Sequence, residues 1–213
     1  MARSFAAHLN LSGRKCLVVG GGEVGWRKAR LLAECGARVT VVGEGFCRGL
    51  KRSQRVRRVA RRFRASDLRG VWLVVVATDD QALNRTIAER AHRLGLLVNV
   101  VDDPEACNFT VPAQMTRGRL TVSVSTEGAS PTLARKIKER LGPLFDETYA
   151  EWLELLAEFR PKALAELPSP EDRRRFFDEL TSDAVYSILK KQGVGSARRH
   201  ARQALRRLAE ESR

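Results

Sequence analysis

Residues that build metal centres and disulfide frameworks are scarce in this chain of 213 residues. Its four cysteines lie far apart and include no Cys-x-x-Cys pair, and its three histidines fall outside every motif described below. This spacing predicts neither a zinc site nor a disulfide network, so we expect no resident metal. The chain also offers no Ser-His-Asp arrangement, which argues against acyl transfer. Most of the cysteines are expected to be small packing residues, with Cys47 as an exposed thiol.

Long apolar runs are missing as well. No apolar stretch reaches the roughly 18 residues that a membrane-spanning helix needs. The first fifteen residues lack the sustained apolar core of a signal peptide. We therefore expect a cytoplasmic protein with no membrane partner.

Acidic residues are fewer than basic ones, at 25 against 39, which gives a formal net charge of +14. Such an excess attracts an acidic partner: a nucleic acid, a membrane surface or a polyanionic small molecule. The arginines concentrate in residues 51–64 and 198–207. Arginine on solvated helix faces explains the excess equally well, so the charge alone does not identify a partner.

The first half of the chain alternates strand patterns with helix patterns. The fully apolar stretch at 71–77 is typical of a central parallel strand. Together, the alternating patterns predict an α/β fold with a Rossmann-type, doubly wound parallel sheet. Strand patterns occupy residues 15–20, 38–42, 56–63, 71–77 and 97–101, and helix patterns occupy 26–35 and 81–94.

The second half changes pattern. Residues 120–125 alternate apolar and polar side chains like a half-solvated strand, with 110–113 as an expected partner. Ser130 before Pro131 places a capping residue and a first-turn proline where a helix should begin.

Beyond residue 144 only helix patterns remain, punctuated by Pro161 and Pro168. We therefore divide the chain into a Rossmann domain at 1–112, a small α+β segment at 113–144 and a helical C-terminal domain at 145–213.

A glycine-rich turn follows the first strand. Gly20, Gly22 and Gly25 satisfy the G-x-G-x-x-G pattern, between a strand ending at Val19 and a helix beginning near Val24. The first glycine permits a tight turn, the second lets the backbone approach a pyrophosphate, and the third lets the helix pack against the strand. The N–H groups at the helix start then face the phosphate charge. The sequence therefore predicts a dinucleotide site here, with a purely structural turn as the alternative.

Two further strand ends contribute to this predicted site. The fingerprint expects an acidic residue about 20 positions after the glycines, and Glu44 follows the second strand closely. Its carboxylate would hold the ribose hydroxyls and favours NAD, whereas Arg48 nearby leaves NADP open. A plain loop carboxylate is the alternative for Glu44. After the strand at 71–77, we expect Thr78 to touch the dinucleotide and Asp80 to cap the next helix.

Carboxylates and hydroxyls mark a candidate reaction site. Asp102 and Asp103 end the last parallel strand, at the sheet edge where ligands collect in such folds. One of them is a candidate general base or metal ligand, and an ordinary Asp-Asp-Pro turn is the alternative. Ser125, Thr126 and Ser130 lead into a helix N-terminus, which predicts an anion-binding surface. A well-capped helix explains the same hydroxyls.

Taken together, these motifs resemble the siroheme synthase family of precorrin-2 dehydrogenases and sirohydrochlorin ferrochelatases. NVVDD followed by STEGASPTLAR makes the resemblance specific, whereas the helical tail is similar only in kind. The matching stretches keep the family's order over about residues 9–142 and read VVGGGEVGWRKARLL, VVVATDD, LNRTIAERA, LVNVVDDPEACNFTVPA and LTVSVSTEGASPTLARKIKERL.

The resemblance implies a function and a set of site residues. It implies NAD-dependent dehydrogenation of precorrin-2 to sirohydrochlorin, followed in some members by insertion of ferrous iron, and a homodimer with 113–144 as its dimerisation segment. Asp102 matches the family's catalytic aspartate, as general base and, in bifunctional members, as proton acceptor or metal guide. Cofactor contacts map to Glu23, Val24, Glu44 and Gly45, the active-site serine maps to Ser125, and Thr126 and Ser130 join it as expected contacts to the polyacidic tetrapyrrole.

Some positions depart from the family pattern. The family usually has alanine at Gly25, and it has glycine at Glu127, where a carboxylate would repel an acidic substrate unless it points away. The methyltransferase domain fused to some members is not in this sequence, so we do not expect synthesis of precorrin-2.

Other functions remain open. One alternative is a dehydrogenase without ferrochelatase activity. Another, from a different class, is a non-catalytic NAD-sensing module that binds nucleic acid through residues 51–64 and the tail. The basic stretches lack interleaved aromatics and the tail shows no helix-turn-helix pattern, so we expect no nucleic-acid partner. A polyacidic tetrapyrrole gives the net charge a candidate cause, because a basic crevice would attract it.

Overall fold

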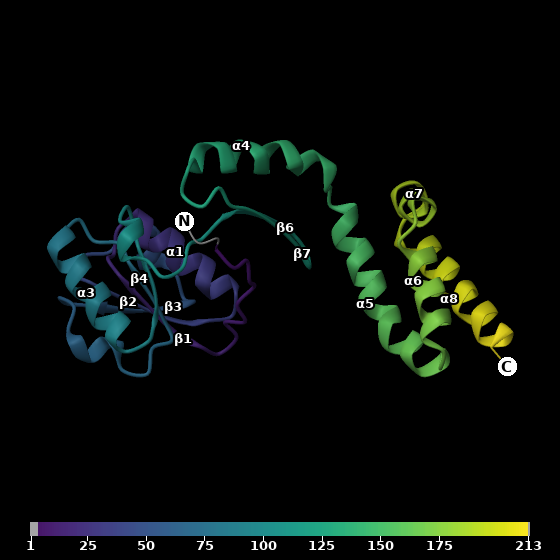
Figure 1. The fold of residues 1–213 in the computed structure, drawn as a ribbon, viewed down its shortest axis with the longest axis horizontal. Helices are drawn as coiled ribbons and strands as arrows, with labels where there is room; N and C mark the ends of the chain where they lie inside the picture. Colours follow the sequence, from purple (N-terminus) through teal and green to yellow (C-terminus); the bar gives the residue numbers. More distant parts are fainter. Residues whose placement is uncertain (1–3, 213) are drawn as a thin grey trace. The chain divides into compact units, whose positions relative to one another are not determined.

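The computed structural model describes residues 4–212, which form two compact units (Figure 1). The first unit ends at Val111 and the second begins at Pro112. Among the described residues, no helix is long and apolar enough to cross a membrane.

The first unit contains a five-stranded parallel sheet in the order β3-β2-β1-β4-β5. Val18 of β1 is fully buried and lies beside Val41 of β2 and Val75 of β4. The α/β class and the Rossmann-type parallel sheet predicted from the sequence are therefore confirmed. The strands are β1 (Lys15–Val19), β2 (Arg38–Gly43), β3 (Val56–Ala60), β4 (Leu73–Val76) and β5 (Leu97–Val100).

Helices cover both faces of this sheet, because each strand alternates its side chains between the two faces. Cys16 and Val18 share a buried cluster with residues of α1 (Glu23–Glu34) and α2 (Arg48–Arg52). Leu17 and Val19 share another with α3 (Gln81–Arg93). Two short 3-10 turns, η1 (Ala65–Leu68) and η2 (Pro104–Ala106), lie after β3 and β5.

Several boundaries in the first unit differ from the sequence expectation. α1 begins at Glu23 rather than at residue 26, because the N–H of Trp26 already donates to the Gly22 carbonyl at 2.9 Å. β3 ends at Ala60 rather than at residue 63, and the next residue turns its side chain to Asp67. The short helix α2 was not expected from the sequence, which shows only a basic run there.

The second unit opens with an antiparallel pair, β6 (Ala113–Arg117) and β7 (Leu120–Val124). The expected pairing is present, but the partner strand starts at Ala113 and runs to Arg117 instead of spanning 110–113. Pro112 has no N–H to donate to a ladder, which is consistent with this start. Helix α4 (Pro131–Leu141) and the turn η3 (Gly142–Leu144) follow.

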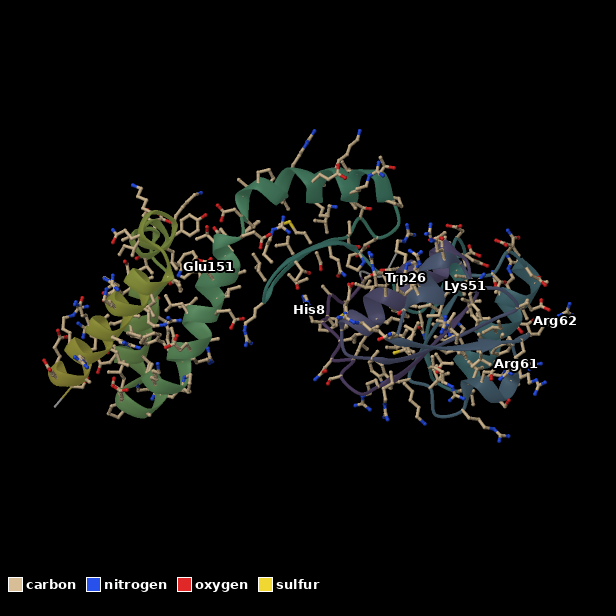
Figure 2. All side chains as sticks on the ribbon, turned by 180° about the vertical axis from the view of Figure 1, so that it is seen from behind. His8, Trp26, Lys51, Arg61, Arg62 and Glu151 are labelled. Atoms are coloured by element: carbon tan, nitrogen blue, oxygen red, sulfur yellow. The ribbon has the colours of Figure 1, made fainter. Side chains whose placement is uncertain are left out.

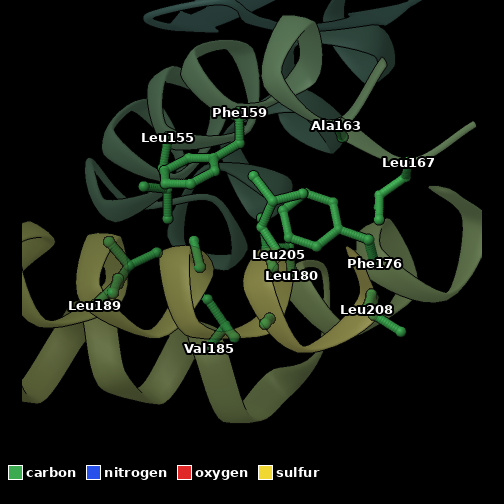
Figure 3. Packing of buried hydrophobic residues seen from close by; sticks show 13 residues of the cluster. Leu155, Phe159, Ala163, Leu167, Phe176, Leu180, Val185, Leu189, Leu205 and Leu208 are labelled. Atoms are coloured by element: carbon green, nitrogen blue, oxygen red, sulfur yellow. The ribbon is translucent and has the colours of Figure 1, made fainter. Parts of the chain in front are cut away.

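The rest of the second unit is a cluster of helices built around one apolar core (Figure 3). Phe159 and Phe176 are fully buried, with ring centroids 6.3 Å apart. Trp152 donates its indole N–H to the Leu180 carbonyl at 2.8 Å, which satisfies its polar atom. The helices are α5 (Thr148–Glu166), α6 (Pro170–Leu180), α7 (Asp183–Gln192) and α8 (Val194–Glu211).

Pro161 does not end a helix as expected, but lies inside α5. Proline removes one backbone hydrogen bond from a helix interior. Leu155, Phe159 and Ala163, spaced four residues apart, are all buried on the inner face of α5. Burial of this face keeps the helix continuous through the proline, whereas Pro168 does separate α5 from α6.

The cysteines differ in one respect from the expectation. Cys47 is only half-buried, not exposed, and Cys35 is the exposed thiol. Burial raises the pKa of the Cys16 thiol to about 11. Among residues 4–212, no cluster of three or more His, Cys, Asp or Glu side chains is arranged to hold a metal ion.

Candidate functional site

The glycine turn between β1 and α1 leaves no room for a side chain at its first position. Gly20 has a φ of +116°, and a Cβ there would lie 2.1 Å from the carbonyl oxygen of Ala77. Its N–H donates to the Val42 carbonyl at 2.9 Å. The turn is therefore pressed between the ends of β2 and β4, and only glycine fits.

Gly22 is different, because a Cβ at this position would meet nothing within 4 Å. The protein itself does not require glycine here, so the open space above Gly22 is available to a ligand. Gly22 is also the N-cap of α1, and no side chain caps the N–H groups of the first helical turn. Such a helix start favours a phosphate group.

A cavity of about 790 Å³ opens at this turn. The glycine turn with Glu23 and Val24 forms one side, and Gly45 and Thr78 lie on two others, after β2 and β4. All the residues predicted to bind the cofactor line this cavity except Gly25. Gly25 instead packs against the turn, since a Cβ there would lie 2.1 Å from the Gly20 carbonyl oxygen.

Glu44 lines the cavity at the end of β2 and is paired with an arginine that the sequence did not identify. Its Oε1 accepts a hydrogen bond from Nε of Arg62 at 3.0 Å, and both side chains are largely exposed. Figure 2 labels Arg62 together with Arg61, which lines the same cavity. Arg48, expected near the ribose, is not among the described lining residues. The sequence feature that could have indicated Arg62 is its position just after β3, the strand that pairs with β2.

Thr78 is held by neighbours at the end of β4. Its hydroxyl bonds to Oδ1 of the buried Asn84, whose amide donates back to the Thr78 carbonyl at 2.9 Å. Asp80 caps α3 as expected, with Oδ1 accepting from the N–H of Leu83 at 2.9 Å. The hydroxyl and the carbonyl of Thr78 are thus both engaged by Asn84, and a contact of Thr78 with the dinucleotide stays a prediction.

Asp102 follows β5 in an unusual backbone conformation. Its φ is +62°, in the left-handed region that non-glycine residues adopt only at a cost of about 1 kcal/mol or more. The residue is exposed, and within the described chain its carboxylate forms no hydrogen bond or ion pair. Asp103 is different: its Oδ2 accepts from Nε of Arg85 at 3.1 Å. Of the two predicted carboxylates, Asp102 is therefore the one left available.

Lys28 of α1 lies in the electrostatic environment of Asp102, a relation that the sequence did not reveal. Burial is the main cause that lowers its pKa, followed by the charge of Arg27, whereas Cys107 and Asp102 act in the opposite direction. The charge of the half-buried Lys28 is thus coupled electrostatically to that of Asp102, without an ion pair between them in the described chain. The sequence feature that could have indicated Lys28 is its position, one turn into the helix that follows the glycines.

The predicted substrate-binding hydroxyls belong to the second unit, where they organise the turn into α4. Oγ of Ser125 accepts from the N–H of Glu127 at 3.2 Å, and Oγ1 of Thr126 accepts from the N–H of Ser130 at 3.1 Å. Ser130 caps α4 by accepting from the N–H of Leu133 at 3.2 Å. These contacts give all three hydroxyls a local structural role, and their contact with a substrate stays a prediction.

Three sequence families match consecutive parts of the chain. An NAD(P)-binding family matches residues 7–113. The central region of sirohaem biosynthesis proteins matches residues 117–142, and the sirohaem synthase dimerisation region matches residues 148–205.

Individual relatives agree with these matches. A siroheme synthase of Thioalkalivibrio sulfidiphilus is 37% identical over 94% of this chain and 42% of its own length. Siroheme synthase 2 of Aeromonas salmonicida is 41% identical over 88% of this chain and 39% of its own. The chain thus spans about two-fifths of these curated relatives. The solved structure of SirC, a precorrin-2 dehydrogenase, matches with a TM-score of 0.76 and 30% identity, over 96% of this chain and 100% of SirC.

Proposed function

Because the chain belongs to the siroheme synthase family, we propose that it is an NAD-dependent precorrin-2 dehydrogenase that forms sirohydrochlorin. The observation that carries this proposal is the cavity at the glycine turn, which gathers the predicted cofactor residues from three strand ends. The match to SirC over the whole of that protein supports the choice of reaction.

The cavity fits a dinucleotide on steric grounds. The space above Gly22 is open, so backbone N–H groups can approach a pyrophosphate. Glu44 is proposed to bind the ribose hydroxyls and to disfavour the extra phosphate of NADP by charge repulsion, although Arg62 offsets part of that repulsion. NAD is therefore the cofactor that we propose, and the ratio of the dissociation constants of the two dinucleotides measures the preference.

A bound nicotinamide supplies the hydride acceptor. The removal of two hydrogens from precorrin-2 then needs a base for the proton that accompanies the hydride. Asp102 is proposed as that base, because its exposed carboxylate forms no hydrogen bond or ion pair in the described chain, and the charge of Lys28 is proposed to favour its ionised form. Ser125, Thr126 and Ser130 are proposed contacts to the carboxylates of the tetrapyrrole.

Incubation of the purified chain with precorrin-2 and NAD tests this function. We expect the absorbance of sirohydrochlorin to grow with enzyme concentration. Turnover no faster than in a protein-free control would contradict the proposal.

Insertion of ferrous iron into sirohydrochlorin is a second proposed step, with iron as a substrate rather than a resident metal. The same free carboxylate of Asp102 would accept the pyrrole protons that leave when iron enters. The assay uses sirohydrochlorin and ferrous iron without NAD, and siroheme absorbance above the rate without protein is the expected result. A dehydrogenase without chelatase activity would give no such increase.

We also propose that the chain forms a homodimer and acts in the cytoplasm. The match of residues 148–205 to a dimerisation region supports the dimer, although the resemblance assigned dimerisation to 113–144, a segment whose larger part matches the central region instead. Analytical ultracentrifugation should give twice the mass of 23.8 kDa.

A further inference from the structure

One part of the sheet in the first unit has no helix over it within the described chain. Leu17, Thr40 and Arg57 are register neighbours on β1, β2 and β3, so their side chains share one face. On this face α3 packs over β4 and β5, but the connection from β3 to β4 contains only the turn η1. As a result Thr40 is half-buried and Arg57 is exposed.

The uncovered strands form the floor of a groove of about 670 Å³. Its floor is formed by the half-buried side chains of Thr40, Val59 and Val71, whereas Leu17 and Val42 line the groove but are almost fully buried. We call this cavity the basic groove, because it is lined by Lys15, Arg38, Arg55, Arg57, Arg61 and Arg69, with Asp67 as the single carboxylate among its described lining residues.

The basic side chains come from different sides of the floor. Lys15 and Arg38 begin β1 and β2, and Arg55 immediately precedes β3. Arg57 lies on β3, the edge strand, and Arg69 lies on the connection that returns to β4. Lys15, Arg38 and Arg55 therefore lie side by side in one row at the starts of β1, β2 and β3, while Arg57 and Arg61 continue the positive charge along the edge at β3.

Most of this charge is not neutralised by the protein. Asp67 is already occupied, because two guanidinium nitrogens of Arg61 donate to its oxygens at 2.8 and 2.6 Å. Across residues 4–212, no carboxylate forms an ion pair with Lys15, Arg55 or Arg57, and the same holds for Arg69. These four side chains are exposed. An anionic ligand would lower their mutual repulsion.

The arrangement of floor and rim favours one shape of ligand. A flat molecule with an apolar centre can lie against Val59 and Val71, and carboxylates on its edge can then reach both the row of cations at the strand starts and the cations along the edge at β3. An extended polyanion such as a nucleic acid strand would instead follow a line of cations and stack its bases on aromatic side chains, and the groove lining contains no aromatic residue among those described.

The groove is separate from the proposed catalytic carboxylate. It lies on β2 and β3, whereas Asp102 follows β5 at the opposite edge of the sheet. Four strand spacings of about 4.8 Å place β3 and β5 about 19 Å apart. The groove adjoins the cofactor cavity, with which it shares Val42 and Arg61.

We infer that the basic groove is a second binding site for a planar polycarboxylate of the tetrapyrrole class, which holds substrate or product away from the reacting centre. The choice of ligand class rests on the proposed function, whereas the existence of an anion site rests on the groove alone.

Uroporphyrin, a flat porphyrin with carboxylates all round its edge, is a suitable probe for a fluorescence titration of the full chain. The test variant is R55Q/R57Q/R69Q, which removes three exposed charges from the groove. The matched control is R199Q/R202Q/R206Q on α8, which removes the same charge from the second unit. Mesoporphyrin, with carboxylates on one side only, serves as a second probe.

The groove variant should bind uroporphyrin about tenfold more weakly than wild type, since three exposed ion pairs are lost, and the control variant should bind it within about twofold of wild type. Mesoporphyrin should distinguish the proteins much less. If both variants lost the same affinity for uroporphyrin, the loss would come from the change in net charge and the inference would be overturned. Unchanged affinity in the groove variant would overturn it as well. Dehydrogenase turnover of the same proteins separates the two proposals: groove-dependent binding without turnover would reject the proposed function alone, whereas turnover with groove-independent binding would reject the groove alone.

Discussion

Gly20 and Gly22 stand two residues apart in the same turn, but their side-chain hydrogens meet different surroundings. Gly20→Ala places a Cβ against the Ala77 carbonyl in a left-handed conformation, and strain with overpacking should cost roughly 3 kcal/mol or more. Gly22→Ala meets no protein atom within 4 Å, so it should fold normally and bind NAD more weakly. Thermal unfolding and NAD titration of both variants measure the two effects. If Gly22→Ala bound NAD with wild-type affinity, the pyrophosphate would not bind against Gly22.

Asp102 and Asp103 form a second pair of neighbours with unequal roles. Asp102→Ala should lower dehydrogenation by about 100-fold or more, because general-base catalysis is lost, while NAD still binds. Asp103→Asn is the control, since Asp103 is paired with Arg85 and should retain turnover within a few-fold. Steady-state kinetics and NAD titration give both answers, and near-normal turnover in Asp102→Ala would remove that residue from the mechanism.

At this scale the sequence predicts residues whose roles are local. The glycines and the cap at Asp80 follow from turn and helix chemistry, which acts over a few positions. Arg62 and Lys28 could not be predicted in the same way. The first meets Glu44 only because β2 and β3 pair, and the electrostatic coupling of the second to Asp102 joins residues that are far apart in the sequence.

Among the elements, long periodic segments were predicted best. β1, β2, β4 and β5 follow from largely buried, apolar stretches, whereas β3 follows from a partly alternating pattern of apolar and basic residues. The missed features are those that tertiary contacts decide. α5 continues through Pro161 because its inner face is buried, and β6 starts at Ala113 because its register follows β7.

Asp146 joins the start of α5 to α7 and gives the second unit a pH-dependent contact. Its Oδ2 accepts from Nζ of Lys190 at 2.9 Å, and its Oδ1 accepts from the hydroxyl of Tyr186 at 3.1 Å. The bond from Lys190 is the main cause that lowers the pKa of Asp146 from 3.8 to about 2. A lowered pKa means that the ionised carboxylate stabilises the fold above about pH 4, and that this contribution is lost as the pH falls towards 2.

Asp146→Asn should therefore unfold more easily than wild type at pH 7, and the difference should shrink between pH 4 and pH 2. Urea unfolding at several pH values measures it. A constant difference across this range would show that the ionised carboxylate is not the source of the stability.

At the scale of the whole molecule, the charge of +14 bears on substrate capture. Because exposed charges are screened by salt, the apparent KM for precorrin-2 should rise with ionic strength, while kcat at saturating substrate changes little. Initial rates over a range of salt concentrations measure both constants. If the KM did not depend on salt concentration, the basic surface would not contribute to substrate binding.

The cofactor cavity and Asp102 are proposed to act together in one dehydrogenation. The most direct test is the amount of NADH formed per sirohydrochlorin when the chain converts precorrin-2 without oxygen. We expect one NADH for each sirohydrochlorin, and no conversion above a protein-free control when NAD is omitted. Equal sirohydrochlorin formation with and without NAD would contradict it.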